Sequence, residues 1–247
     1  MLFSSIPFLF YYLPIVLSAY FLSPRRLKNT TLLLSSLFFY GWGEPRFLIF
    51  MIVSIVLGYA SGLLIERYRR HAKVFLAVSA AASLGLLGYC KYADFFIENL
   101  NALTGMSYPL LRIALPIGIS FYTFQILSYV IDVYRRDVEA QKSLVDLAAY
   151  VAMFPQLIAG PIVRYSDVAK QLKDRVHSVE KASSGLTRFT VGLAKKILIA
   201  NLLGEVVAVY KESSEASVLF SWLYAAAYLF HIYFDFSGYS DMAIGLG

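Results

Sequence analysis

The sequence predicts an all-α fold, a polytopic bundle of transmembrane helices, on three observations. Apolar residues make up 59% of the 247 residues and charged residues only 15%, and the mean hydropathy is +0.63. Soluble domains carry about 25% charged residues. Aromatic residues, which suit membrane interfaces, account for 16% of the chain. We expect one membrane domain over residues 1–247, with about seven or eight spans of ~20 residues.

The apolar runs set the expected helices in order. The first run starts at Leu2 without a basic leader or a small-residue cleavage pattern, so we interpret it as a retained span. The second is short and would need to tilt or to thin the bilayer. The expected segments are 3–22, 31–42, 47–65, 74–92, 113–133, 145–163, 190–209 and 218–234.

The segment 145–163 contains three residues that interrupt helices. Pro155 and Pro161 each lack a backbone N–H donor, and Gly160 precedes the second proline. Irregular backbone at membrane depth is tolerated only where protein or a water-filled cavity surrounds it. We therefore expect a broken or re-entrant helix in 145–163 that lines a cavity.

The basic residues indicate an orientation. If 145–163 re-enters without crossing, one side of the membrane holds every lysine and arginine except Arg46, Lys91, Arg112 and Lys211. If this segment crosses, the two sides hold similar numbers. The positive-inside rule therefore favours the re-entrant interpretation, with the N-terminus on the outer side.

Residues 164–190 mix charges with Val168, Leu172 and Val176 at four-residue spacing. This pattern is typical of an amphipathic helix on the inner leaflet, with basic residues toward anionic lipid, and equally of a solvated connecting helix. Membrane lipids are thus expected partners and account for the formal net charge of +6. Nucleic acid is not expected, because no recognisable binding module accompanies the basic residues.

Two ionisable residues in the last apolar run are weak candidates for catalysis. His231 and Asp235 are four residues apart and therefore share a helix face. A carboxylate that accepts from one imidazole nitrogen raises the basicity of the other, which is the arrangement of a general base. The alternative is a histidine that serves only in hydrogen-bonded packing.

The polar residues around Gly238 are candidates for the end of a substrate tunnel. We expect Gly238 to end or bend the helix. Asp235, Ser237, Tyr239 and Asp241 would then form a polar turn at the cytoplasmic mouth of a cavity, although an ordinary helix end explains the same residues. No metal is expected, because the oxygen ligands are too few for Ca²⁺ or Mg²⁺ and there is a single cysteine.

Four earlier polar residues are further tunnel candidates. Ser120 and Gln125 lie within an apolar run, where such residues line a cavity or hold helices together. Gln156 and Arg164 flank the expected helix break. Arg164 suits the binding of a phosphate or carboxylate, and equally an anchoring role at the membrane surface.

Four motifs carry a resemblance to a known family. They are Leu115-Pro-Ile-Gly-Ile-Ser-Phe-Tyr122, Ser128-Tyr-Val-Ile-Asp-Val-Tyr-Arg135, Phe154-Pro-Gln-Leu-Ile-Ala-Gly-Pro161 and Tyr233-Phe-Asp-Phe-Ser-Gly-Tyr-Ser-Asp-Met-Ala-Ile-Gly245. Together they resemble the membrane-bound O-acyltransferase family, and most of all its bacterial branch of alginate O-acetyltransferases and related polysaccharide acetylases. The similarity covers nearly the whole chain, in the family's order.

The resemblance implies a helical bundle around a tunnel in the bacterial inner membrane, with the N-terminus in the periplasm. It implies an enzyme that transfers an acetyl group to an exported cell-surface polysaccharide such as alginate. Acetyl-CoA or another activated acyl carrier would be the co-substrate, with no bound cofactor. Periplasmic or membrane acetylation partners are expected as well.

The family's catalytic histidine lies in a Trp-His motif downstream of the fourth motif, and the resemblance places it beyond Gly247. Within the chain, Trp42 precedes Gly43 and Trp222 precedes Leu223. We therefore expect an N-terminal fragment that supplies much of the tunnel, has no catalytic base of its own and is inactive by itself. The alternatives are a transporter or flippase, and a non-catalytic scaffold of a polysaccharide export complex.

Overall fold

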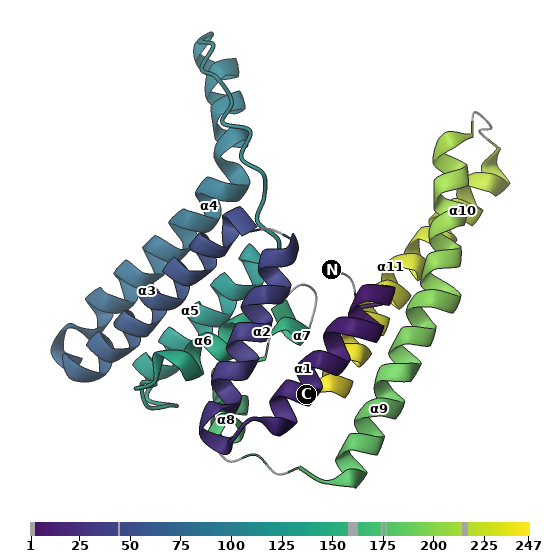
Figure 1. Ribbon diagram of the computed structural model, residues 1–247. Coiled ribbons are helices and arrows are strands. Elements are labelled where there is room, and N and C mark those ends of the chain that lie inside the picture. The colour runs from purple at the N-terminus through teal and green to yellow at the C-terminus, as the bar shows by residue number, and fades with distance from the viewer. Residues whose placement is uncertain (1–2, 44, 158–162, 174, 176, 214–216) are drawn as a thin grey trace. The chain divides into compact units, whose positions relative to one another are not determined.

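The regular structure of the described residues is entirely helical, which confirms the predicted all-α fold. The computed structural model (Figure 1) describes residues 3–43, 45–157, 163–173, 175, 177–213 and 217–247. The chain divides into two compact units. The expectation of a single membrane domain stays a prediction. Unit 1 comprises residues 1–18, 159–161 and 176–247, and unit 2 comprises residues 19–158 and 162–175.

Unit 2 contains four longer helices followed by three short ones. Each of the 3₁₀ turns η2 (Arg25–Leu27), η3 (Pro45–Phe47) and η4 (Arg69–His71) leads into the next long helix. The helices are α2 (Lys28–Gly43), α3 (Leu48–Arg67), α4 (Ala72–Thr104), α5 (Ile119–Arg135), α6 (Leu144–Ala152), α7 (Phe154–Leu157) and α8 (Tyr165–Lys173).

The core of unit 2 forms around α5, which packs closely against α3. A Cβ built on Gly58 would lie 2.5 Å from Cγ2 of Ile126, and one built on Gly62 would lie 2.5 Å from the hydroxyl oxygen of Tyr129. Small residues allow membrane helices to approach each other in this way. The glycines of α3 therefore fix the face of α5 that is buried.

Helix α4 is longer than the predicted segment 74–92, because it continues to Thr104 and contains 33 residues. In Figure 1 its C-terminal end projects beyond the neighbouring helices. Gly105, with φ 69°, ends the helix. The Asp94 carboxylate then accepts from the backbone N–H groups of Leu111, at 2.7 Å, and Arg112, at 3.0 Å, and holds the returning chain against the helix. Polar residues after position 90 thus mark the end of the apolar run and not the end of the helix.

The helix break predicted within 145–163 is confirmed. Helix α6 ends at Ala152, Met153 leaves the helical conformation with ψ 113°, and α7 adds four residues. The residues of α7 are all buried, so protein surrounds this irregular backbone. Gly160 and Pro161 lie outside the described residues. Neither short helix reaches the ~20 residues of a span. This length supports a re-entrant segment, and the topology stays a prediction.

The segment 164–190 forms two helices and not one. Helix α8 covers its first part, and Leu172 and Val168 pack against the core of unit 2. Protein therefore covers the apolar face of α8, as expected of a connecting helix that lies on the molecule. The second part begins a new helix at Val179. Val176 lies outside the described residues.

Unit 1 contains a long helical hairpin. α9 (Val179–Ala194), the π-helix η5 (Lys195–Ala200) and α10 (Asn201–Glu212) run on without interruption, and α11 (Val218–Leu246) packs along all three (Figure 1). The predicted segment 190–209 is the middle of this rod. The N-terminal part of unit 1 consists of η1 (Phe8–Tyr12) and most of α1 (Leu13–Leu22).

Three helical stretches of the described residues are long and apolar enough to cross a membrane: Pro45–Arg67, Arg69–Thr104 and Val218–Leu246. The apolar helix Phe8–Leu22 is shorter. These segments support a membrane protein, and the expected total of seven or eight spans stays a prediction.

Candidate functional site

The predicted site residues lie in both units. His231, Asp235, Ser237, Tyr239 and Asp241 belong to α11 of unit 1. Ser120, Gln125, Gln156 and Arg164 belong to unit 2. Each unit therefore holds its own set of candidates.

Gly238 lies inside α11 and neither ends the helix nor forms a polar turn, so that expectation is wrong. The physical reason is the close approach of α9 to α11. A Cβ built on Gly192 would lie 2.5 Å from the Gly238 carbonyl oxygen, and one built on Gly238 would lie 2.8 Å from the Gly192 carbonyl oxygen. The same contact recurs seven residues away, where a Cβ on Gly185 would lie 2.5 Å from the Gly245 carbonyl oxygen.

Gly247 directly follows the last residue of α11, so the helix continues well past the expected turn. The Gly247 backbone N–H donates to the Ala243 carbonyl oxygen at 3.2 Å, which is the hydrogen bond of one more helical residue. The family histidine expected beyond Gly247 lies outside this chain, and its position stays a prediction. Within the described residues, the charged candidates of α11 have their partners on α9 and η5.

Asp241 is the centre of a charged cluster between α9, η5 and α11. Its Oδ2 accepts from Nζ of Lys195 at 2.6 Å, and its Oδ1 accepts from Nε of Arg188 at 3.1 Å. Lys195 also donates to Oγ of Ser237 at 3.1 Å. The Asp241 side chain is only 17% exposed. Charge-assisted hydrogen bonds of this kind compensate the loss of hydration that burial imposes.

Asp235, six residues earlier in α11, makes a separate ion pair. Its Oδ1 lies 2.5 Å from Nζ of Lys196. Both carboxylates of α11 are thus neutralised by lysines that start the π-helix, and the sequence analysis predicted no partner for these lysines. The matched seven-residue spacing of Gly185 and Gly192 with Gly238 and Gly245 is the signal that identifies the hairpin. A tunnel-lining role for the α11 candidates stays a prediction.

His231 does not pair with Asp235. Its Nδ1 lies 2.7 Å from the backbone carbonyl oxygen of Ala200, at the end of the π-helix. A carbonyl oxygen only accepts, so Nδ1 carries the proton and Nε2 of the neutral ring is an acceptor. The ring also packs on Gly204, where a Cβ would lie 3.0 Å from Cε1. The contact with the backbone carbonyl fixes the tautomer of His231. The sequence suggested that the Asp235 carboxylate would do this.

Tyr239 serves in aromatic packing. Its ring stacks on Phe3 with centroids 4.6 Å apart and an interplanar angle of 12°, and Phe3 in turn stacks on Phe8. The N-terminal segment of unit 1 is therefore held against α11 close to the charged cluster.

In unit 2, three buried tyrosines form a frame around the start of α8. The ring of Tyr165 makes edge contacts with Tyr129 and Tyr150, at centroid distances of 5.0 and 5.3 Å. Tyr150 donates from its hydroxyl to the Val163 carbonyl at 2.6 Å. Gln141 donates from Nε2 to the Tyr165 hydroxyl at 2.9 Å. Burial raises the pKa of Tyr165, so this hydroxyl stays protonated.

The two candidate glutamines of unit 2 differ in their contacts. Gln156 donates from Nε2 to the Tyr150 carbonyl at 2.5 Å and so ties α7 to α6. Gln125 is fully buried, and neither amide atom has a hydrogen-bond partner among the described residues. A buried polar group without a partner is destabilising and indicates water or a ligand. Gln125 is therefore the better candidate of the two for lining a polar cavity.

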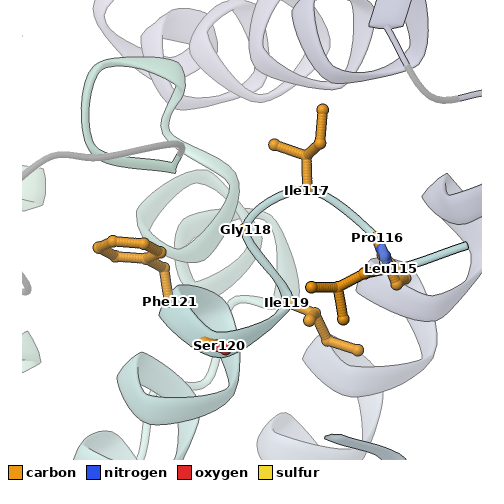
Figure 2. A pocket seen from close by; sticks show the side chains of 7 residues that line it. All are labelled: Leu115, Pro116, Ile117, Gly118, Ile119, Ser120 and Phe121. Atoms are coloured by element: carbon orange, nitrogen blue, oxygen red, sulfur yellow. The ribbon is translucent and has the colours of Figure 1, made fainter. Parts of the chain in front are cut away.

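Ser120 lies in the first turn of α5, beside a pocket of about 260 Å³ that residues 115–121 line. Figure 2 shows the loop through Pro116 and Ile117 entering the helix at Gly118, with Ser120 as the polar side chain among the labelled residues. The backbone φ of Gly118 is 76°, a conformation that favours glycine, and its Cβ would lie 2.6 Å from the Leu157 carbonyl oxygen. The pocket is thus shaped by the contact of α5 with the broken helix.

Arg164 is exposed at the start of α8 and forms no ion pair among the described residues. Asp132 of α5 is a buried carboxylate that the sequence analysis did not name as a candidate. The sequence alone could have identified Asp132, because a carboxylate inside an apolar helix is itself a candidate functional residue. Within the part of the chain that the structure describes, no group of three His, Cys, Asp or Glu residues is suited to a metal ion.

An all-α chain with long apolar helices and ion pairs between them is a polytopic helical membrane protein. Residues 139–247 match the family model of the membrane-bound O-acyltransferases (MBOAT). The chain is 45% identical, over 254 residues, to the probable alginate O-acetylases AlgI of Pseudomonas syringae pv. tomato and of Pseudomonas aeruginosa. Each match covers 100% of this chain and 49% of the relative.

A more distant relative is the peptidoglycan O-acetyltransferase of Helicobacter pylori, with 33% identity over 282 residues, 100% of this chain and 54% of the relative. The chain spans about half the length of the curated relatives it matches. Residues 139–247 thus match the membrane-bound O-acyltransferase family, and the chain is similar along its entire length to alginate O-acetylases.

Proposed function

We propose that this chain provides membrane helices of an O-acetyltransferase that modifies an exported cell-surface polysaccharide, with alginate as the first candidate. The observation that carries the proposal is the 45% identity to alginate O-acetylases along the entire chain. Peptidoglycan is the second candidate acceptor, because that relative is 33% identical along the entire chain.

The reaction joins an acetyl carbonyl to a sugar hydroxyl. The hydroxyl oxygen attacks the carbonyl carbon of an activated donor, the bond to the donor's leaving group breaks, and the hydroxyl proton passes through a base to that group. A sugar hydroxyl is a weak nucleophile at neutral pH, so the base is needed. We propose that the family's Trp-His motif, beyond Gly247, supplies it. No tryptophan within 1–247 precedes a histidine, so we expect this stretch alone to be inactive.

His231 is the best candidate for a base within the chain itself, because its hydrogen bond to Ala200 leaves Nε2 as an acceptor. We propose, however, a structural role for it, since Nδ1 is held by the backbone and Gly204 packs against the ring. A structural histidine and a catalytic histidine make opposite predictions for a substitution at this position.

We propose the bacterial inner membrane as the location, with a periplasmic N-terminus. The donor, acetyl-CoA or another activated acyl carrier, would enter from the basic, cytoplasmic side. Polysaccharide and acetylation partners would meet the enzyme in the periplasm. The basic residues at the ends of the unit 2 helices support this orientation. Three basic residues of unit 1 give weaker support for this orientation, because they are paired with carboxylates of α11. They are Arg188, Lys195 and Lys196.

The proposal is tested in an alginate-producing strain whose own O-acetylase is deleted. Residues 1–247 and the extended reading frame are expressed separately, and O-acetyl groups on the exported alginate are measured by proton NMR. We expect acetylation from the extended frame, with or without His231→Ala, and none from 1–247. Acetylation by 1–247 that His231→Ala abolishes would show that the base lies within the chain. Membrane insertion of the extended frame without any acetylation would favour a scaffold or a transporter.

A further inference from the structure

Two cations of unit 2 lie at the ring of Tyr20, close to the end of α1. Nζ of Lys28 lies 4.5 Å from the centroid of this ring, and Cζ of Arg175 lies 5.5 Å from it. Lys28 also lies 5.6 Å from the centroid of the Phe21 ring. The two rings meet edge to face, with their centroids 5.4 Å apart. A lysine and an arginine that are far apart in the sequence are thus brought to one aromatic ring.

Hydrogen bonds hold Arg175 in this position. Its Nη2 donates to Oδ1 of Asn29 at 2.6 Å, and its Nη1 donates to the Tyr20 hydroxyl oxygen at 3.3 Å. The Asn29 amide in turn donates to Oδ1 of Asp146 at 2.7 Å and to the Leu172 carbonyl oxygen at 3.2 Å. The carboxylate of this network is therefore bonded to a neutral amide. The guanidinium is fixed in place without an anion of its own.

Both cations are accessible and lack a carboxylate partner. Neither Lys28 nor Arg175 forms an ion pair among the residues that the structure describes. Both side chains are partly exposed, and the neighbouring Arg25 and Arg26 of η2 are exposed as well. Contact with an aromatic ring attracts each cation but leaves the repulsion between the two in place. An anion bound at both cations would remove this repulsion.

An exposed apolar surface adjoins the two cations. Phe21 is 60% exposed and Leu22 is 86% exposed, at the end of the apolar helix Phe8–Leu22. Tyrosine and lysine side chains at such a helix end suit the level of the lipid headgroups. A small anion would use only the charges of this site, whereas a lipid would use its apolar surface as well. The combination of charge and apolar surface therefore favours a phospholipid.

We propose that this site binds the phosphate of an anionic phospholipid such as phosphatidylglycerol. The phosphate oxygens would accept from Nζ of Lys28 and from the N–H donors of Arg175 that its two hydrogen bonds leave unused. The acyl chains would pack on Phe21 and Leu22. A zwitterionic lipid fits less well, because its ammonium brings another positive charge to the two cations. This inference concerns lipid binding and goes beyond the proposed acyl transfer.

The test is native mass spectrometry of the full 247-residue chain, stripped of lipid in detergent and then mixed with lipids of identical acyl chains. We expect phosphatidylglycerol to be retained about tenfold better than phosphatidylethanolamine or phosphatidylcholine. Lys28→Gln and Arg175→Gln should each lower the retention of phosphatidylglycerol about fivefold, the factor expected of one basic residue near an anionic headgroup. Retention of the two zwitterionic lipids should change little in either variant.

A matched control separates the site from the general charge of the surface. Lys170→Gln removes an exposed positive charge from α8 and should leave the preference intact. Lys28 takes no part in the hydrogen bonds that hold Arg175, so its variant keeps the test valid if Arg175→Gln does not fold. Equal retention of the three lipids, or equal losses in Lys28→Gln and Lys170→Gln, would overturn the inference. Displacement of phosphatidylglycerol by equimolar inorganic phosphate would also overturn it, because the acyl chains would then contribute nothing.

Discussion

Gly192 and Gly238 meet backbone to backbone in the hairpin of α9 and α11. A Cβ on Gly192 would lie 2.5 Å from the carbonyl oxygen of Gly238, a distance at which the two helices have to move apart. The contact brings Lys195 within 2.6 Å of Asp241 and so allows the charged cluster to form. In unit 1, the pairing of charges therefore depends on the close packing of the small residues.

Gly192→Ala should destabilise the hairpin although alanine is the better helix former. The added methyl group meets backbone, which cannot rotate away, and overpacking of this kind costs about 1–3 kcal/mol. We expect the melting temperature in detergent to fall by about 2–8 °C. Gly88→Ala in α4 is the matched control, because nothing lies within 4 Å of its Cβ. An equal response of the two variants would contradict the close contact.

Asp241→Asn should weaken the same hairpin through charge. Lys195 and Arg188 both lose their carboxylate partner, and loss of a charge-assisted hydrogen bond costs about 1.5–3 kcal/mol. Lys195→Met should restore part of this stability in the Asp241→Asn background, because it removes the unpaired cation. A thermal-melting double-mutant cycle measures the coupling, and additive effects would show that the pair contributes nothing.

Tyr150→Phe tests the frame around α8. The variant keeps the ring that contacts Tyr165 and removes the hydroxyl that donates to Val163. We expect a loss of about 1 kcal/mol and faster hydrogen exchange at the start of α8. Tyr89→Phe, on the exposed side of α4, is the control and should change neither quantity. Unchanged exchange in Tyr150→Phe would mean that the hydroxyl does not hold this segment.

The apolar runs were sufficient to predict the helices but not their ends. Hydropathy stops near position 92, whereas α4 continues to Thr104, because Asp94 and the returning chain stabilise a part of the helix that is no longer apolar. The break in 145–163 was predictable, because the prolines act through local backbone chemistry. Gly238 was misinterpreted for the opposite reason, since its role depends on Gly192, a residue far away in the sequence.

The sequence predicted which types of residue form the candidate site, but not how these residues contact one another. The apolar run made its carboxylates candidates, and Asp235 and Asp241 each pair with a lysine, but these partners depend on tertiary packing. Lys195 and Lys196 were counted only as basic residues on one side of the membrane, because such a count ignores pairing. Asp132 belongs to the second motif, and its distinguishing feature is that its Oδ2 is buried without a hydrogen-bond partner among the described residues.

Nδ1 of His231 should carry a proton. The carbonyl of Ala200, 2.7 Å away, accepts that proton and fixes the tautomer. Nitrogen-15 NMR of histidine-labelled protein distinguishes the two ring nitrogens, and the chain has only 3 histidines to assign. A spectrum with the proton of His231 on Nε2 would contradict the hydrogen bond and the structural role inferred from it.

The most direct test of the central claim is a chimera. The matching half of the Pseudomonas syringae alginate O-acetylase, to which this chain is 45% identical, is replaced by residues 1–247. The chimera is expressed in a strain without that enzyme, and the O-acetyl content of exported alginate is measured by proton NMR. We predict acetylated alginate, because this chain would supply equivalent membrane helices to the same catalytic half. A chimera that inserts stably into the inner membrane and leaves alginate unacetylated would contradict the account.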